Sequence, residues 1–269
     1  MAGKLSIGTA WTEAAAFVRI ERRLLAPVVL GLVMVPAVIA SMVQPDASAG
    51  ARPEAGGWMI LTLLMLLAMV IGQLAIALLA TGWRGSVGAA IGRSAKRLPT
   101  LMLAGLAVMI PIFIFMTMIM MLSGVKAGAN GQLTQSSSGP ASSLLFLLLF
   151  AAVLYLVVRL LPLVPIVANG DDGPIAALKR SFAMTKGSFW KLLGFLLLLA
   201  IAFAVAGLAI SAVVGTFVTL ALGRPEPWSV SLLLIALVGG LIQAAFITIY
   251  SAMLARIAVQ LNGPPTSGT

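Results

Sequence analysis

The chain has 269 residues, of which 61% are hydrophobic and 9% are charged. A soluble domain has about 25% charged and 45–50% apolar residues, so this composition excludes an ordinary soluble domain and a disordered chain. There is no His and no Cys, which excludes disulfides, thiolate or His-ligated metal sites and a Ser-His-Asp triad. We therefore expect an integral membrane protein without a cofactor or a metal site.

Six apolar segments are long enough to cross a bilayer, because about 20 helical residues span its hydrocarbon core. They predict an all-α polytopic membrane bundle that forms a single domain over residues 1–262, followed by a disordered tail at 263–269. The fifth segment continues to about Leu222, which is longer than a span needs, so it could tilt or break near Gly215. The expected spans lie near 24–43, 58–80, 100–122, 143–168, 189–215 and 230–256.

The basic residues alternate with the spans. Fourteen of the seventeen fall on one side, and only Arg52, Lys126 and Arg224 fall on the other. Because basic loops stay in the cytoplasm, we expect both termini inside a bacterial inner membrane. A cleavable signal peptide ending near residues 47–49 is the alternative, although the first apolar run of about 20 residues exceeds the usual 7–15 of a signal core.

Each cytoplasmic basic segment has the pattern of a short amphipathic helix that precedes two spans. In the second segment an apolar stripe lies opposite Arg93, Lys96 and Arg97. Residues 89–94 (AAIGRS) also align with residues 176–181 (AALKRS), at an offset of 87 residues. The chain is therefore interpreted as three units, each a short cytoplasmic amphipathic helix followed by a hairpin of two spans.

Basic amphipathic helices lie at the headgroup level, where each Lys or Arg contributes on the order of 1 kcal/mol of attraction to anionic phospholipid. They could bind lipids or membrane-protein partners, or they could only fix the topology, which is the interpretation we favour. Nucleic acid is not an expected partner, because the charge lies in short segments rather than in one large patch. The candidate contacts with lipid headgroups are Arg93, Lys96, Arg97, Arg159, Lys179, Arg180 and Lys186.

The fourth apolar segment contains Arg159, Pro162 and Pro165. The prolines are expected to kink it. A charge near mid-bilayer costs at least about 2.5–3.5 kcal/mol, so Arg159 needs a partner or a route to water. It could snorkel, pair with Asp171 and Asp172, or bind a lipid phosphate, and we favour snorkelling or structural pairing.

Asp171 and Asp172 are the only adjacent acidic pair in the chain. They could bind a hard cation, but such a site needs about six or more oxygen ligands. The favoured interpretation is a helix-start signal before Pro174, because acidic side chains are stabilised near a helix N-terminus. No acid lies inside a long apolar run, which leaves ion-coupled transport with little support.

A distinctive stretch begins at Arg159 with RLLPLVPIV, continues over residues 173–181 with GPIAALKRS and ends over residues 185–191 with TKGSFWK. It resembles the bacterial family called the membrane domain of glycerophosphoryl diester phosphodiesterases. In that family an Arg and prolines end one span, G-P-x-x-A-L-x-R-S opens a linker helix and T-x-G-x-F-W starts the next span.

The resemblance covers the membrane part of those enzymes and implies no catalytic residue here. Their activity belongs to a separate soluble barrel with a catalytic His and metal-binding carboxylates, and this chain has no His. We therefore expect a non-enzymatic protein that binds or organises lipids or partner membrane proteins. The alternative is a permease or a membrane component of an exporter, which would need a polar cavity near mid-membrane.

Overall fold

The computed structural model describes residues 6–43, 56–122, 125–127, 133–135, 140–226 and 228–262. The expected disordered tail at 263–269, the signal-like residues 47–49 and two of the basic residues, Lys4 and Arg52, lie outside the described residues.

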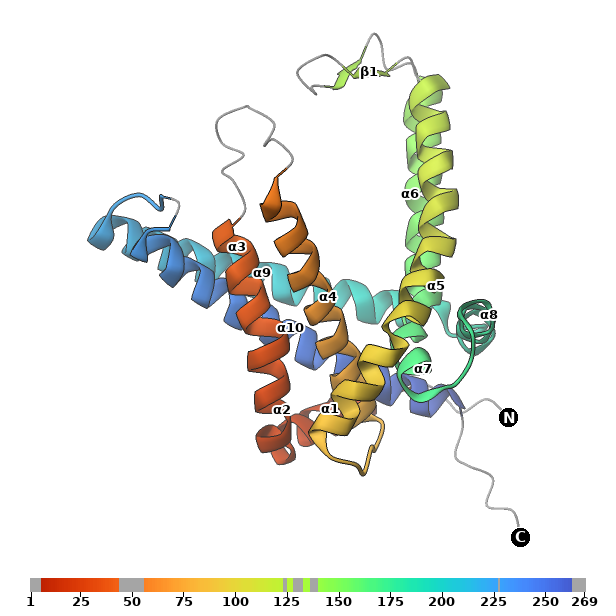
Figure 1. Cartoon of the computed structure of the whole chain (residues 1–269). Helices are drawn as coiled ribbons and strands as arrows, with labels where there is room; N and C mark the ends of the chain where they lie inside the picture. Colours follow the sequence, from red (N-terminus) through yellow and green to blue (C-terminus); the bar gives the residue numbers. More distant parts are fainter. Residues whose placement is uncertain are drawn as a thin grey trace.

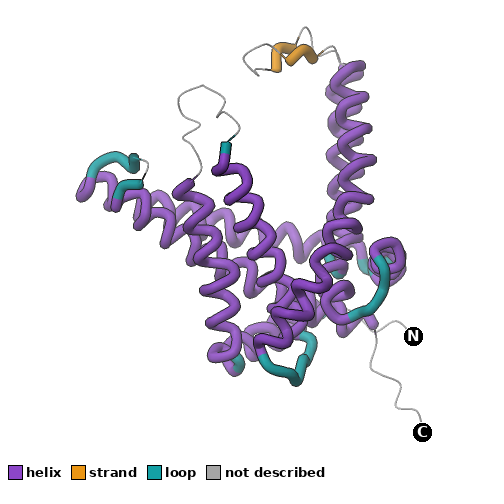
Figure 2. Tube along the Cα trace, viewed as in Figure 1, coloured by secondary structure: helices purple, strands orange, loops and turns teal. Residues whose placement is uncertain are grey.

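Within this part of the chain, six helical segments are long and apolar enough to cross a membrane, which confirms the all-α polytopic fold. Figure 2 shows that helices make up most of the molecule. The candidate spans are Arg22–Val43, Gly57–Ala80, Val87–Met121, Ser143–Asn169, Phe189–Leu222 and Val230–Leu261.

The elements follow one another as eleven helical pieces and one short hairpin among the described residues. The hairpin pairs β1 (Val125–Ala127) with β2 (Leu133–Gln135) in antiparallel register. The helical pieces are α1 (Ile7–Ile20), α2 (Arg22–Val29), the π-helical turn η1 (Leu30–Met34), α3 (Val35–Val43), α4 (Gly57–Ala80), α5 (Val87–Leu122), α6 (Pro140–Leu160), α7 (Leu163–Asn169), α8 (Pro174–Met184), α9 (Phe189–Leu222) and α10 (Val230–Asn262).

Two of the three expected amphipathic helices are separate helices, α1 and α8. The second is not: it forms the first turns of α5, a single helix of 36 residues that passes through Pro99 and Pro111. Ser86 caps its start, where the Ala89 backbone N–H donates to the Ser86 Oγ at 3.2 Å. A proline bends a helix without always ending it, and α5 changes direction along its length (Figure 1).

The fourth and fifth apolar segments differ in continuity. The fourth divides at the turn formed by Leu161 and Pro162, and Pro162 becomes the N-cap residue of α7, so the expected kink is a full break between α6 and α7. The fifth stays unbroken through Gly215 to Leu222. Proline removes a backbone donor and clashes with the preceding turn, whereas one glycine only lowers helix propensity.

Close packing is concentrated around α4 and α10. α10 contacts α1, η1, α3, α4 and α9, and its Gly240 faces α3: a Cβ built there would lie 2.8 Å from the Val38 Cγ2. Gly72 on α4 lies nearly as close to η1, with its built Cβ 3.0 Å from the Leu32 Cβ. Small residues let membrane helices approach in this way. Side chains with no more than 2% exposure fill the centre: Leu74, Ile76, Leu78, Met253, Leu254 and Ile257.

The paired spans fan outward from this centre. Figure 1 shows that α3 with α4, α5 with α6, and α9 with α10 leave a shared base in different directions. We call this base the basic end; it comprises α1, the first turns of α5, α7, α8 and the last turns of α10. The Ser6 backbone N–H donates to the Gln260 Oε1 at 3.2 Å, so the first and last described turns also meet there.

Candidate functional site

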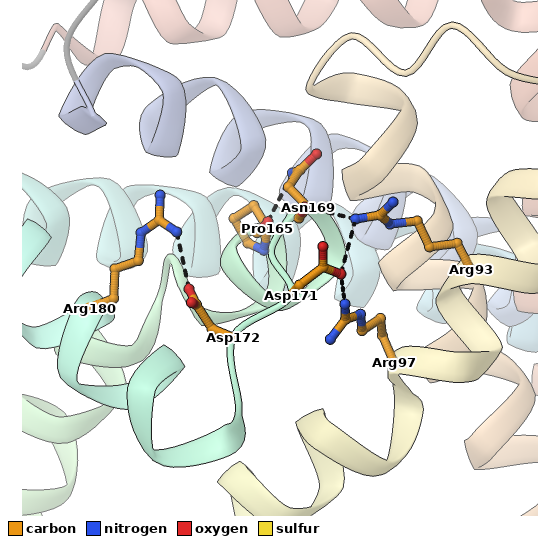
Figure 3. Close-up of polar contacts among 7 residues, drawn as sticks. All are labelled: Arg93, Arg97, Pro165, Asn169, Asp171, Asp172 and Arg180. Carbon is orange, nitrogen blue, oxygen red and sulfur yellow. Dashed lines mark hydrogen bonds and ion pairs between the residues drawn. The ribbon is translucent and has the colours of Figure 1, made fainter.

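A cluster of three arginines and two aspartates joins α5 to the α7–α8 connection at the basic end (Figure 3). Arg93 and Arg97 lie one turn apart on α5 and both pair with the Asp171 carboxylate, Arg93 at 3.6 Å between its Nη2 and the Asp171 Oδ1. Arg93 also donates to the Asn169 backbone carbonyl at 3.0 Å and lies 5.7 Å from the centre of the Trp83 ring. Arg180 on α8 completes the cluster through its 3.1 Å contact between Nη1 and the Asp172 Oδ2.

The two halves of this cluster are equivalent in the sequence repeat. Arg93 and Arg180 occupy matching positions at the offset of 87 residues, and each binds one of two adjacent carboxylates. The serines that follow them match as well, since Ser94 is 1% exposed and Ser181 is fully buried. The interpretation of three repeated units stays a prediction, and the structure adds that an acidic connection binds the two matching arginines.

The aspartates pair with arginine rather than opening α8 directly. They lie in the connection before Pro174, and the first turn of α8 contains no acid. Both carboxylates are accessible: the Asp171 side chain is 83% exposed and the Asp172 side chain is 38% exposed. No group of three or more metal-binding side chains was found among the described residues, and arginine pairing accounts for both acids.

Arg159 occupies a separate, more enclosed site between α6 and α8. Its Nε donates to the Tyr155 Oη at 3.0 Å, and its Nη1 donates to the Phe182 carbonyl at 3.2 Å and to the Thr185 Oγ1 at 3.3 Å. Ser181 donates back to the Arg159 carbonyl at 2.7 Å. Arg159 therefore does not pair with Asp171 or Asp172, and that expectation was wrong. Its contacts agree with the structural role that the sequence favoured.

Sequence reasoning missed the partners of Arg159. Tyr155 could have been found, because it precedes Arg159 by four residues and so shares its helix face. Thr185 and the Phe182 carbonyl could not, because they reach Arg159 only when α8 folds back against α6.

The seven candidate headgroup residues thus divide into two groups. Four arginines, Arg93, Arg97, Arg159 and Arg180, hold elements of the protein together. The other three are lysines on the surfaces of α5 and α8 and in the turn after α8. They are exposed, with no ion pair among the described residues: Lys96, Lys179 and Lys186.

A cavity of about 260 Å³ lies next to the cluster, between α4, α7, α8 and α10. Its polar lining comes from Thr81, Asn169 and Arg180. Thr81 donates to the Asn169 Oδ1 at 2.7 Å, and the Asn169 Nδ2 donates to the Pro165 carbonyl at 2.9 Å, so the amide is fixed in place. The Arg180 side chain is 46% exposed, which leaves part of its guanidinium accessible beside the Asp172 pair.

Residues 133–262 match the model of a protein family described as the membrane domain of glycerophosphoryl diester phosphodiesterase. The matched region contains Arg159, the α7–α8 connection, α8 and the start of α9, which carried the resemblance in the sequence, and it extends through α10. No curated protein and no solved structure matches the chain. Over residues 133–262 the chain is therefore similar to the membrane domain of glycerophosphoryl diester phosphodiesterase, which confirms the resemblance seen in the sequence.

Proposed function

We propose that the protein is a non-catalytic, multi-pass membrane protein that binds anionic phospholipid headgroups at its basic end and so organises lipids or partner membrane proteins. The basic end then faces the cytoplasm of a bacterial cell. The observation that carries the proposal is that Lys96, Lys179 and Lys186 are exposed on elements of the basic end, where Arg180 also lines a cavity.

The position of α8 supports binding at the headgroup level. Ala177 and Ser181 face inward and are fully buried, whereas Ile175 is 63% exposed and Lys179 lies one turn further along on the exposed side. A helix with a buried small-residue face and an exposed apolar and basic face is suited to the boundary between headgroups and acyl chains. Each exposed lysine there adds about 1 kcal/mol of attraction to an anionic leaflet.

The non-catalytic part of the proposal is supported by the residue types in the chain and by the family match. There is no His in the sequence, and the family match concerns a membrane domain. Hydrolysis of a glycerophosphodiester by the purified chain would contradict this part of the proposal.

The alternative is a permease or a membrane component of an exporter. Such a protein would use the groove between α9 and α10, about 370 Å³ in volume, where Ser211 and Gln243 lie among Phe203, Phe246 and small residues. Two uncharged polar side chains are a thin lining for a solute path, so lipid binding is favoured.

Native mass spectrometry of the full chain in detergent tests the proposal. We expect phosphatidylglycerol and cardiolipin to bind in preference to phosphatidylcholine. Removing three charges with Lys96→Gln, Lys179→Gln and Lys186→Gln should weaken phosphatidylglycerol binding by about tenfold or more, given about 1 kcal/mol per lysine.

The matched comparison removes three exposed charges elsewhere near the basic end, on α1 and α2: Arg19→Gln, Arg22→Gln and Arg23→Gln. We expect this variant to keep more of the lipid binding than the lysine variant, because its charges do not lie on α5 or α8. Equal losses in the two triple variants would show a diffuse charge effect, and no loss in the lysine variant would overturn the proposal.

A further inference from the structure

A second cavity lies under α1, and one of its walls is Trp83, whose ring also contacts Arg93 of the arginine–aspartate cluster. The cavity measures about 200 Å³ and is enclosed by the junction of α1 with α2, the end of α4 and the last turns of α10. Its lining combines two opposite charges, Glu21 and Arg256, with the aromatic rings of Phe17 and Trp83 and with leucine side chains. Sites for drug-sized ligands have volumes of about 300–1,000 Å³, so this cavity suits a smaller molecule of headgroup size.

Arg256 is a cation without a hydrogen-bond acceptor among the described residues. Its Nε is buried and makes no hydrogen bond, and its flanking residues Ala255 and Ile257 are fully buried. The guanidinium lies 5.8 Å from the centre of the Phe17 ring on α1, within reach of a cation–π contact. A buried guanidinium donor is costly unless it meets an acceptor, and a phosphate supplies several acceptor oxygens at once.

Glu21 supplies the complementary charge on the same cavity. Its backbone is held at the α1–α2 junction, where its carbonyl accepts from the backbone N–H groups of Leu24 and Leu25 at 2.9 Å. Its carboxylate makes no ion pair within 4 Å to Arg256, nor to another residue that the structure describes. The two charges are therefore held apart on one cavity rather than neutralising each other.

The cavity lies near the end of α10 that belongs to the basic end. Arg256 precedes the last residue of α10 by six positions, a distance of about 9 Å along a helix with 1.5 Å rise per residue. Leu24 lines the cavity and is 46% exposed, so the rim of the cavity is accessible from outside the protein.

We propose that this cavity binds a phosphoethanolamine group, with its phosphate on Arg256 and its ammonium between Glu21 and the aromatic walls. A purely anionic ligand would satisfy Arg256 but would meet the carboxylate of Glu21, whereas a zwitterion satisfies both. An ammonium is also attracted to the face of a Trp or Phe ring. This site uses residues and a ligand class different from those of the proposed function, so either proposal can fail without the other.

The test measures the thermal unfolding of the full chain in detergent during titration with short-chain lipids of equal acyl length. We expect dihexanoyl phosphatidylethanolamine to raise the Tm saturably, and dihexanoyl phosphatidylglycerol to do so only at higher concentration. Arg256→Gln should weaken phosphatidylethanolamine binding about tenfold or more, because it removes charge-assisted hydrogen bonds. Glu21→Gln should remove the preference for phosphatidylethanolamine over phosphatidylglycerol.

Two further arms keep the proposal falsifiable. Leu24→Trp keeps both charges but narrows the cavity, and it should lose binding even if Arg256→Gln fails to fold. Free O-phosphoethanolamine distinguishes the sources: saturation at the same concentration as the lipid assigns the site to a soluble zwitterion, and much weaker binding assigns it to a lipid.

The control variants are Glu13→Gln on the exposed face of α1 and Arg224→Gln beyond α9, which should bind as the wild type does. Unchanged binding in both Arg256→Gln and Leu24→Trp would overturn the site. An unchanged preference of Glu21→Gln for phosphatidylethanolamine over phosphatidylglycerol would overturn the assignment of a zwitterionic ligand.

Discussion

The basic end and the outer halves of the spans are built differently. In an apolar stretch of 18 residues in α4, 44% of the residues are buried inside the protein. In the corresponding stretches of α5 and α9, only 11% of the residues are buried. Met121 at the end of α5 and Leu220 near the end of α9 are 85% and 81% exposed. The arginine–aspartate cluster, the Arg159 contacts and both polar cavities lie at or near the basic end.

This difference reflects the fact that lipid acyl chains, rather than water, surround the spans of a membrane protein. Acyl chains are as apolar as leucine, so spans gain little from hiding leucine from lipid and can diverge freely. Polar contacts and close packing must then hold the helices together where they meet. We conclude that the basic end holds the fold together, and the following substitutions test that conclusion.

The largest expected difference is between two leucines. Leu254→Ala empties a site that is 1% exposed on α10, and by analogy with buried leucines elsewhere it should lower the free energy of unfolding by about 2–5 kcal/mol. Leu220→Ala changes an 81% exposed side chain on α9 and should cost less than about 0.5 kcal/mol. Unfolding in mixed micelles measures both, and equal costs would contradict the difference between the two regions.

Arg159→Gln should have the next largest effect. It removes charge-assisted hydrogen bonds to Tyr155, the Phe182 carbonyl and Thr185, and we expect a loss of about 2–3 kcal/mol. Arg224→Gln, an exposed arginine beyond α9, is the matched control and should stay within about 0.5 kcal/mol of the wild type. If Arg159→Gln is as stable as Arg224→Gln, then Arg159 has no structural role.

The repeat-equivalent serines offer a finer comparison. Ser181→Ala removes the 2.7 Å bond to the Arg159 carbonyl and should cost about 1 kcal/mol. Ser94→Ala removes a buried hydroxyl that has no hydrogen-bond partner among the described residues, so the stability of this variant should be unchanged or slightly raised. The same unfolding assay decides, and the reverse order would contradict the hydrogen-bond assignments.

The smallest effects are expected at the aspartates. Asp171→Asn and Asp172→Asn weaken ion pairs that are partly exposed, and each should cost about 0–1 kcal/mol, less at high salt. Thermal unfolding at low and high ionic strength is the measurement. If an aspartate variant lost more stability than Arg159→Gln at both salt concentrations, the arginine–aspartate cluster would matter more for stability than the Arg159 contacts.

Much of the fold could be predicted from the sequence because its signals are local. Apolar run length located the six spans, and letter matching at an offset of 87 residues located the matching starts of α5 and α8. The break at Pro162 was visible as a proline signal, although its severity was not. The continuity of α5 through Pro99 depends on the helix around it, which no single residue specifies.

The sites were less predictable because their partners are distant in the chain. Arg93 and Asp171 are 78 residues apart, and Phe17 meets Arg256 only because α1 packs on α10. The sequence could list the charged residues, but it could not show which arginines are paired and which lysines stay exposed.

The most direct test of the whole scheme asks which side of the membrane each end occupies. Because the chain has no Cys, Lys179→Cys and Arg224→Cys each introduce a single thiol at an exposed position, one at the basic end and one beyond α9. An impermeant maleimide is added to right-side-out and to inverted vesicles. We expect Lys179→Cys to react only in inverted vesicles and Arg224→Cys only in right-side-out vesicles. Labelling of both variants from the same side, or of Lys179→Cys from outside, would contradict a basic end bound to the cytoplasmic leaflet.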